Sequence, residues 1–287
     1  HRIIRYSLAM TARNSQPRIE VEHVQKRFGT VEALSDVTLT LGDNEVLGLV
    51  GDNGAGKSTF IKTLVGIHQP DGGEIRFNGK PVTINGPKHA RKLGIGTVYQ
   101  DLALVDELSV AENLFLGRMP VKKLGGVVSV VDREYMTQEA DRILSEHLNI
   151  HVDPDTPVEY LSGGERQAVA IGRALVTDPD IVLLDEPTSA LSKAAVEHVE
   201  ELVEQLRNSG HSVILIDHNL EEVLSMTDRV AVLFQGRIVD VVDTETITRD
   251  DVVSMMVSGK SVREDENVDN ELIDRQSDAG SSSTSTV

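Results

Sequence analysis

The sequence predicts an α/β domain built on a largely parallel sheet. Three short runs are almost wholly apolar: EVLGLV from Glu45, IVLLDE from Ile181 and SVILID from Ser212. Runs of this kind are typical of parallel strands, which are buried on both faces. Patterns of helical hydrophobic spacing lie between them. The alternation of strand and helix patterns therefore predicts a sheet covered by helices.

A second, smaller sheet is predicted near the N-terminus. Residues 18–28, 36–41, 73–84 and 94–100 alternate apolar and polar side chains. Alternation with a period of two is typical of half-buried strands, which are commonly antiparallel. We therefore expect an antiparallel β subdomain formed by these four segments.

An inserted α-helical subdomain is predicted at about residues 101–160. The segments SVAENLFLGR from Ser109 and DREYMTQEADRILSEHL from Asp132 have the spacing of amphipathic helices. We expect one folded domain over residues 17–259. Residues 1–16 are expected to be a disordered leader or a non-native extension, with Met10 as the native start. Residues 260–287, acidic and ending in serine and threonine, are expected to be a disordered tail.

Composition limits the classes of function. The chain has 287 residues, 39% of them hydrophobic, which suffices for a buried core. No apolar run approaches the roughly 18–20 residues of a membrane span, and there is no cysteine for disulfides, thiol catalysis or a cysteine-ligated metal. The net charge of −18 argues against nucleic acid as a partner. It also suggests a halophilic source, a hypothesis that activity at low salt and failure in molar KCl would contradict.

The stretch GDNGAGKST, which follows the first apolar run, predicts a phosphate-binding loop, and with it a P-loop NTPase fold. It fits the pattern G-x-x-x-x-G-K-[ST] and precedes a helical pattern. Glycines let backbone N–H groups approach phosphates, the lysine reaches the β- and γ-phosphates, and the following hydroxyl ligates Mg²⁺. The predicted nucleotide-binding residues here are Gly51, Asp52, Asn53, Gly54, Ala55, Gly56, Lys57, Ser58 and Thr59, with Ser58 also a metal ligand.

An acidic pair follows the second apolar run. Asp185 and Glu186 end a predicted strand, where ligands of open α/β sheets bind. We expect Asp185 to hold Mg²⁺, directly or through water. We expect Glu186 to act as the general base that polarises the attacking water.

The stretch LSGGERQ, from Leu161, resembles the signature of the ATP-binding cassette (ABC) ATPases. It lies about a hundred residues after Lys57 and shortly before the acidic pair. Here Ser162, Gly163, Gly164 and Glu165 would open a helix and offer its free N–H groups to an anion. The resemblance covers roughly residues 17–259 and implies binding and hydrolysis of ATP with Mg²⁺.

The resemblance assigns roles to further residues. Gln100 resembles the family's glutamine that senses Mg²⁺ and couples to a membrane partner, and His218 resembles its histidine that contacts the γ-phosphate. Phe28 falls where the family places an aromatic ring on adenine. The sequence departs from the family pattern at Ser192, where many members have aspartate. A serine there keeps a hydrogen bond but loses an ionic contact.

The family also implies partners. We find one set of nucleotide motifs and so expect one module, which would pair with a second copy or a homologue around two ATP molecules. The further expected partners are a separate permease dimer and, indirectly, an extracytoplasmic solute-binding protein, with the chain peripheral on the cytoplasmic face of the membrane. Several stretches, including DEPTSALS and HNLEEVLSMTDRVAVLFQGRI, resemble importers of monosaccharides such as ribose, xylose or fructose. The alternatives are an importer of another solute such as amino acids, a non-transport ABC ATPase, and an ATP-dependent regulator.

Overall fold

The computed structural model describes residues 16–124, 128–189 and 191–262. Apart from residue 16 and residues 260–262, the predicted leader and tail lie outside the described residues. Within the described part of the chain, none of the helices has the length and apolar character needed to cross a bilayer.

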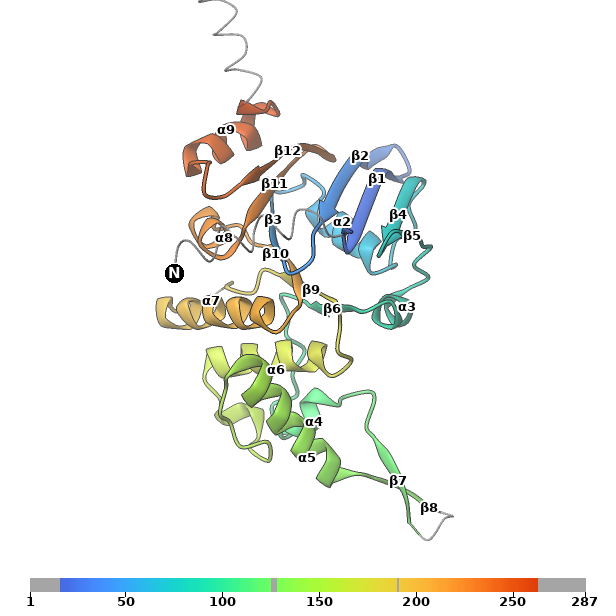
Figure 1. The fold of residues 1–287 in the computed structure, drawn as a ribbon, viewed down its shortest axis with the longest axis vertical. Helices are drawn as coiled ribbons and strands as arrows, with labels where there is room; N and C mark the ends of the chain where they lie inside the picture. The colour runs from blue at the N-terminus through green and yellow to red at the C-terminus, as the bar shows by residue number, and fades with distance from the viewer. Residues whose placement is uncertain (1–15, 125–127, 190, 263–287) are drawn as a thin grey trace, which may run out of the picture.

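Ten strands of the described residues form one sheet in the order β5-β4-β1-β2-β12-β11-β3-β10-β9-β6 (Figure 1). Its second half, from β11 to β6, is parallel, which confirms the strands predicted from the three apolar runs. These strands are β11 (Arg229–Phe234), β3 (Val46–Val50), β10 (Ser212–Ile216), β9 (Ile181–Asp185) and β6 (Ile95–Val98).

The other half of the sheet is mainly antiparallel, as predicted. It contains β1 (Ile19–Phe28), β2 (Val31–Leu41), β4 (Gly72–Phe77) and β5 (Lys80–Pro81). The two halves join where β12 (Arg237–Asp243) meets β2, through the single paired position Arg237 with Asp36. The antiparallel strands therefore continue the main sheet instead of forming a separate one.

The prediction for residues 94–100 was wrong. This segment forms β6, which pairs in parallel with β9 at the far edge of the main sheet. Ile95, Gly96 and Val98 are buried because β6 packs against both α3 (Pro87–Lys92) and α6 (Gly163–Leu175). Its alternation arises from glycine and threonine, which are small enough to be covered, and not from a solvent-facing side.

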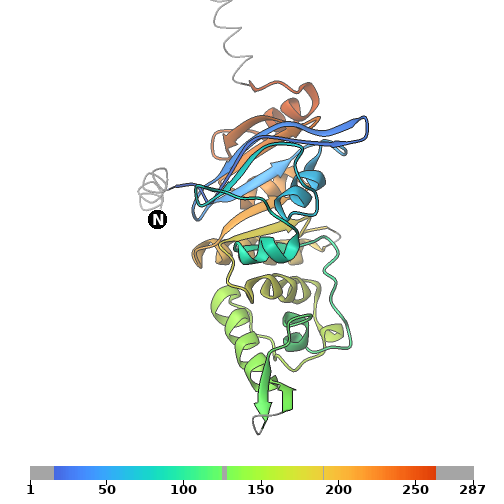
Figure 2. The same cartoon turned by 90° about the vertical axis from the view of Figure 1, so that its right-hand side faces the viewer.

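The remaining helices lie around the sheet (Figures 1 and 2). A group of helices lies in the lower part of both views, below the sheet. It contains α6 and the helices of residues 110–114 and 133–142, which are coloured green. The helices not yet given are α2 (Lys57–Leu64), α4 (Val110–Leu114), α5 (Arg133–Arg142), α7 (Lys193–Asn208), α8 (Leu220–Met226) and α9 (Arg249–Ser258).

The interval 101–160, where an inserted helical subdomain is predicted, contains α4 and α5, a π-helical turn (Ile143–His147) and a 3₁₀ turn (Val158–Tyr160). The predicted helix from Ser109 to Arg118 is shorter than expected, because Gly117 adopts a left-handed φ of 78° that a helix cannot continue through. The interval also holds an antiparallel hairpin of β7 (Val121–Leu124) and β8 (Val128–Val131), which the sequence analysis did not predict.

Two hydrophobic clusters cover the two faces of the parallel strands. Val182, Leu184 and Leu215 belong to the cluster that includes the lower helices. Leu183 and Ile214, their neighbours along the same strands, belong to the cluster under α2. Successive side chains of a strand point to opposite faces, so both faces are buried and every position must be apolar. The polar residues of these strands therefore lie at their ends, as Ser212 and Asp185 do.

Candidate functional site

The predicted phosphate loop connects β3 to α2 and is tightly enclosed. A Cβ atom at Gly51 would lie 2.3 Å from the carbonyl oxygen of Leu233. At Gly56, which precedes α2 with φ of 115°, a Cβ would lie 2.7 Å from the carbonyl oxygen of Ala33. Only glycine fits both positions, so the loop is held close against the β1–β2 hairpin and β11 with its backbone open to a ligand.

Lys57 folds back over this loop. Its Nζ donates hydrogen bonds to the carbonyl oxygens of Gly51, at 2.5 Å, and Asp52, at 3.2 Å. Burial lowers the pKa of Lys57, while the nearby carboxylates of Glu186, Asp52 and Asp185 act in the opposite direction. The ammonium group is therefore partly desolvated and positioned for an anion. A cavity of about 130 Å³ lies alongside, lined by Val50, Gly51, Asp52, Asn53, Lys57, Asp217, His218, Leu220 and Met256.

The acidic pair lies at the carboxyl end of β9, as predicted. Burial raises the pKa of Asp185, the charge of Glu186 raises it further, and Lys62 and Lys57 oppose this shift. Glu186 has a left-handed φ of 51°, and its N–H donates to the carbonyl oxygen of Ile216 at 2.8 Å. A non-glycine residue in this conformation is strained, and such strain is common at active sites. The carboxylates are thus held close together on the side of the phosphate loop.

This raised pKa gives a pH-dependent contribution to stability. Ionisation of Asp185 costs more in the folded chain than in the unfolded chain, whose pKa is near 3.8. The stabilising contribution of the protonated Asp185 carboxyl is fully present below the unfolded pKa and is lost as pH rises through the higher folded pKa. In Asp185→Asn, which cannot ionise, we expect the free energy of unfolding to increase relative to wild type as pH rises from about 4 to about 7. Urea denaturation without nucleotide or Mg²⁺ measures the difference.

Asp250, whose side chain is 95% exposed on α9, provides the control. Asp250→Asn should show no comparable increase. A constant difference between Asp185→Asn and wild type over this pH range would contradict the electrostatic role assigned to Asp185.

His218 lies beside Glu186 at the end of β10. Its Nδ1 is 3.7 Å from Glu186 Oε2 and 3.4 Å from Asp217 Oδ1. Asp217 is 1% exposed and receives three hydrogen bonds: from the N–H of His218 at 2.7 Å, the N–H of Asn219 at 3.1 Å and the hydroxyl of Thr188 at 2.5 Å. Asp217 and Thr188 were not predicted as site residues. The one signal in the sequence was a carboxylate at the end of an apolar strand.

Substitution of Thr188 measures how much its buried hydrogen bond to Asp217 contributes to the free energy of unfolding. Thr188→Val keeps the shape but leaves one carboxylate oxygen without its donor. We expect a loss of roughly 1.5–3 kcal/mol in the free energy of unfolding, the usual range for a hydrogen bond to a charged group. Thr188→Ser, which restores the hydroxyl, should lose less in the same urea titration. Equal stability of Thr188→Val and wild type would refute the assignment.

The three predicted metal ligands come from separate elements with their ends at one edge of the sheet. Ser58 is the second residue of α2, which follows β3; Asp185 ends β9, and Gln100 follows β6. Because these strands are parallel, their carboxyl ends share that edge. Gln100 Nε2 also donates to the hydroxyl of Ser189 at 3.4 Å, on the loop after Glu186. Hydroxyl, carboxylate and amide oxygens suit Mg²⁺, which usually takes the rest of its ligands from water and phosphate.

The described residues contain no group of three histidine, cysteine, aspartate or glutamate side chains suited to hold a metal by themselves. The donor set above therefore fits a metal brought with a phosphate ligand better than a permanently bound one.

Phe28, the predicted adenine contact, ends β1 and is 44% exposed. Its ring meets His68 edge-on at 4.9 Å, and Lys26 Nζ lies 5.6 Å from its centroid. The hairpin that follows Phe28 also carries Ala33, which closes on Gly56 of the phosphate loop. The ring is thus on an element adjacent to the loop and accessible to a ligand.

The predicted signature residues, 162–165, lie at the start of α6 and not on the phosphate loop. Ser162 caps α6: its hydroxyl accepts from the N–H of Glu165, and the Glu165 carboxylate accepts from the N–H of Ser162 at 2.8 Å. Gly163 and Gly164 form the first turn, and a Cβ at Gly164 would lie 2.7 Å from the His198 ring on α7. Among the described residues, no hydrogen bond or ion pair connects residues 162–165 with residues 51–59. The two segments predicted to bind anions are therefore on separate elements of the chain.

Ser192, where the sequence departs from the family pattern, caps α7. Its hydroxyl accepts from the N–H of Ala195 at 3.4 Å. Serine is a favoured residue at this helix position. The substitution is therefore compatible with the local fold.

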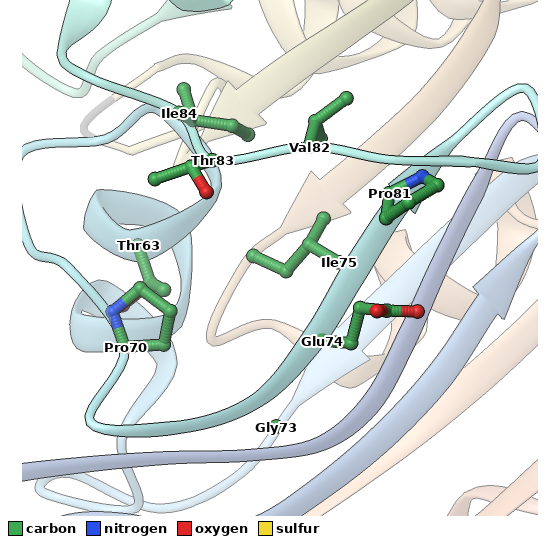
Figure 3. A pocket seen from close by; sticks show the side chains of 9 residues that line it. All are labelled: Thr63, Pro70, Gly73, Glu74, Ile75, Pro81, Val82, Thr83 and Ile84. Carbon is green, nitrogen blue, oxygen red and sulfur yellow. The ribbon is translucent and has the colours of Figure 1, made fainter.

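A second cavity lies away from the phosphate loop. It has a volume of about 260 Å³ and lies between the end of α2 and the β4–β5 edge (Figure 3). Its lining consists of Thr63, Pro70, Gly73, Glu74, Ile75, Pro81, Val82, Thr83 and Ile84. It brings together none of the predicted site residues.

Comparison with known proteins identifies the family. The sequence model of the ABC transporter family matches residues 34–189, more than half of the chain. The chain belongs to the ABC transporter family. The match includes the phosphate loop, the signature and the acidic pair, so the family predicted from LSGGERQ is confirmed.

Several curated ABC relatives are importers of sugars by name. A ribose import ATP-binding protein of Rubrobacter xylanophilus is 45% identical, with 87% of this chain and 48% of that protein covered. One of Streptomyces coelicolor is 42% identical over 85% of this chain and 47% of its own length. A xylose/arabinose import ATP-binding protein of Sulfolobus acidocaldarius is 40% identical over 84% and 94%. The chain spans about half the length of most of these relatives.

Solved structures agree on the fold. An ATP-binding cassette of an ABC transporter superposes with a TM-score of 0.74 at 28% identity, covering 85% of this chain and 98% of that one. A nucleotide-free cassette gives 0.70 at 30% identity, covering 79% and 91%. The predicted α/β ABC cassette fold is therefore confirmed.

Proposed function

We propose that this ABC cassette hydrolyses ATP to drive uptake of a sugar through a separate permease. The observation that carries the ATPase part is the convergence of Lys57, Glu186 and His218 beside one phosphate loop. Lys57 would hold the β- and γ-phosphates, since its ammonium already folds over the loop at 2.5 Å from a loop carbonyl. Phe28 would stack on the adenine ring.

Hydrolysis needs a base at the γ-phosphate. Glu186 would accept the proton of the attacking water, and His218, 3.7 Å from it, would contact the γ-phosphate and hold Glu186 in place. Mg²⁺ held by Ser58, Asp185 and Gln100 would neutralise charge on the phosphate oxygens. The strained backbone of Glu186 fixes the carboxylate near the phosphate loop before the substrate arrives.

A second module is part of this proposal. The signature cap at Ser162 and the phosphate loop do not meet within the chain, so ATP bound to the loop would meet the signature of another copy or of a homologue. In a head-to-tail pair, each phosphate loop would face the signature of the other module, which gives two ATP sites. Mass measurement by light scattering should show a dimer of Glu186→Gln with ATP and Mg²⁺ and a monomer without nucleotide. A monomer under both conditions would contradict a homodimer.

The import part rests on the relatives, which are named for ribose and for xylose or arabinose. By this proposal the chain lies on the cytoplasmic face of the membrane, bound to a permease dimer that receives sugar from an extracytoplasmic solute-binding protein. Importers of amino acids and non-transport ATPases are the competing assignments, and none of the described residues would touch the solute.

The decisive experiment is reconstitution. Proteoliposomes holding the permease encoded beside this chain, with its solute-binding protein, should take up radiolabelled ribose or xylose only with ATP and wild-type cassette. Glu186→Gln should abolish uptake. Uptake of an amino acid would show that the solute is not a sugar. Association with ribosomal or DNA-repair proteins, and not with the permease, would overturn the proposed transport function.

A further inference from the structure

The ring of Phe28, the predicted adenine contact, lies at an irregular end of its strand. The last paired position of β1 and β4 is Gln25 with Gly72. The pairing of β1 with β2 changes register three times, the last time between Lys26 and Arg27. Irregular pairing of this kind bends a strand and interrupts its ladder of hydrogen bonds. The ladder by itself therefore does not fix the position of Phe28.

Asp71 takes the place of the ladder at this point. Its N–H donates to the carbonyl oxygen of Gln25 at 2.8 Å, and its carboxylate accepts from the N–H of Arg27 at 2.7 Å. The other carboxylate oxygen accepts from Lys26 Nζ at 3.0 Å. The hydrogen bonds from Arg27 and Lys26 lower the pKa of Asp71, so the carboxylate is ionised at neutral pH. One side chain thus holds the two residues that precede Phe28.

Two side chains contact the Phe28 ring directly. Lys26 Nζ lies 5.6 Å from the ring centroid, within the range of a cation–π contact. The side chain of Lys26 is only 14% exposed, which restricts the position of its ammonium group. His68 meets the ring edge-on at 4.9 Å. Because the ammonium group over the ring also pairs with Asp71, this carboxylate acts on Phe28 through Lys26 as well as through the backbone.

His68 connects the ring to the phosphate loop. The N–H groups of Ile67 and His68 both donate to the carbonyl oxygen of Lys62, at 2.8 and 3.1 Å, which fastens this segment to the end of α2. The other end of α2 begins at Lys57, directly after the phosphate loop. A base on the Phe28 ring and phosphates on the loop must belong to one ATP molecule. A ring displaced relative to α2 would therefore lose its contact with the base.

We propose that Asp71 is a positioning residue for the nucleotide base: through Lys26 and the N–H of Arg27, it holds the Phe28 ring where the adenine of ATP stacks. The inference rests on the proposed ATPase function, in which Phe28 contacts adenine. An aromatic face stacks on any base, so loss of a positioning residue weakens binding of ATP and of GTP alike. Binding of a triphosphate without a base is unaffected.

The affinities for three probes test this role. Phe28→Ala should raise the dissociation constant for ATP about fivefold or more, the effect of losing one stacked base. Asp71→Ala should raise it at least about threefold, a part of that effect, and should raise the dissociation constant for GTP by the same factor. Inorganic tripolyphosphate with Mg²⁺ should bind both variants with wild-type affinity.

Two results with Asp71→Ala would overturn the proposal. Equal weakening of tripolyphosphate and ATP would show that the substitution disturbs the phosphate loop. Weakening of ATP alone, with GTP unchanged, would show that Asp71 recognises the edge of the base. Asp71→Asn, which keeps an acceptor for the N–H of Arg27, serves if Asp71→Ala is unstable; it should also weaken ATP and not tripolyphosphate.

A double-mutant cycle tests the route through the ring. If Asp71 acts only through Phe28, the combination of Phe28→Ala and Asp71→Ala should bind ATP no more weakly than Phe28→Ala alone. Additive losses would overturn the proposal. Asp36→Ala is the matched control, because Asp36 contacts His23 Nδ1 at 2.9 Å on the same hairpin and is 51% exposed, against 46% for Asp71. It should bind ATP like wild type.

The mobility of the ring gives a readout that does not depend on binding. The chain has no tryptophan, so Phe28→Trp places a single indole at the stacking position. Without nucleotide, the fluorescence anisotropy of this indole should fall when Asp71→Ala is added and stay unchanged when Asp36→Ala is added. Unchanged anisotropy with Asp71→Ala would overturn the proposal, because the ring would then be held by other contacts.

Failure of this inference is distinguishable from failure of the proposed function. If Phe28→Ala weakens ATP binding and Asp71→Ala does not, the positioning role of Asp71 is wrong and the adenine contact stands. If Phe28→Ala itself leaves the affinity for ATP unchanged, the adenine contact in the proposed function is wrong, and the positioning role falls with it.

Discussion

Replacing Glu186 with glutamine should leave ATP binding intact and slow ATP hydrolysis at least about a hundredfold, the effect expected for loss of a positioned general base. Glutamine has nearly the same shape but cannot accept the proton of the attacking water. The backbone N–H of residue 186 would still donate to Ile216, so the loop should keep its conformation. Release of phosphate measures hydrolysis, and calorimetric titration with ATP and Mg²⁺ measures binding.

Glu134→Gln provides the matched control, since Glu134 lies on α5 with its side chain 76% exposed. It should hydrolyse ATP at the wild-type rate. If Glu186→Gln does so as well, another group must activate the water, and His218 would be the first candidate because its Nδ1 lies 3.7 Å from Glu186 Oε2.

Replacing Lys57 with alanine should weaken ATP binding itself. The phosphates would lose a charge-assisted hydrogen bond, which is worth roughly 1.5–3 kcal/mol, so the dissociation constant should rise about 10- to 100-fold. Burial already lowers the pKa of Lys57, which means that its ammonium is held partly out of water until a phosphate arrives. The same calorimetric titration gives the measurement.

Lys92→Ala is the control, because Lys92 is exposed on α3. Unchanged affinity in Lys57→Ala would count against the phosphate-loop assignment. The two substitutions are informative together: Lys57→Ala should fail at binding, whereas Glu186→Gln should fail only after binding. A single shared defect would indicate a misfolded loop in place of two separate roles.

Much of the fold could be predicted from local sequence patterns. The strands β3, β9 and β10 were recognisable because both of their faces are buried, which requires uninterrupted apolar residues. The helix that begins within LSGGERQ was recognisable because Ser162 and Glu165, three positions apart in the sequence, form a capping box. Such signals are local and are readable without knowledge of the neighbours.

Elements with ambiguous patterns were assigned wrongly or missed. The edge strand β6 alternates like a half-exposed strand, although α3 and α6 cover both of its faces. The β7–β8 hairpin lies between two predicted helices, and its strands, VKKL and VSVV, have only four residues each and no regular alternation. Short patterns of this kind fit several structures, and the packing around them decides which one forms.

The sequence by itself determined the candidate groups for the chemistry: a glycine-rich loop with Lys57, the acidic pair at Asp185 and Glu186, and the cap at Ser162. Each depends on residue types at a fixed spacing along the chain, and this spacing can be read from the sequence without knowledge of the fold. Only the tertiary structure decided that His218 lies 3.7 Å from Glu186 and that Thr188 holds the buried Asp217. These contacts join residues far apart in the chain, and their positions depend on the packing of the whole sheet and its helices.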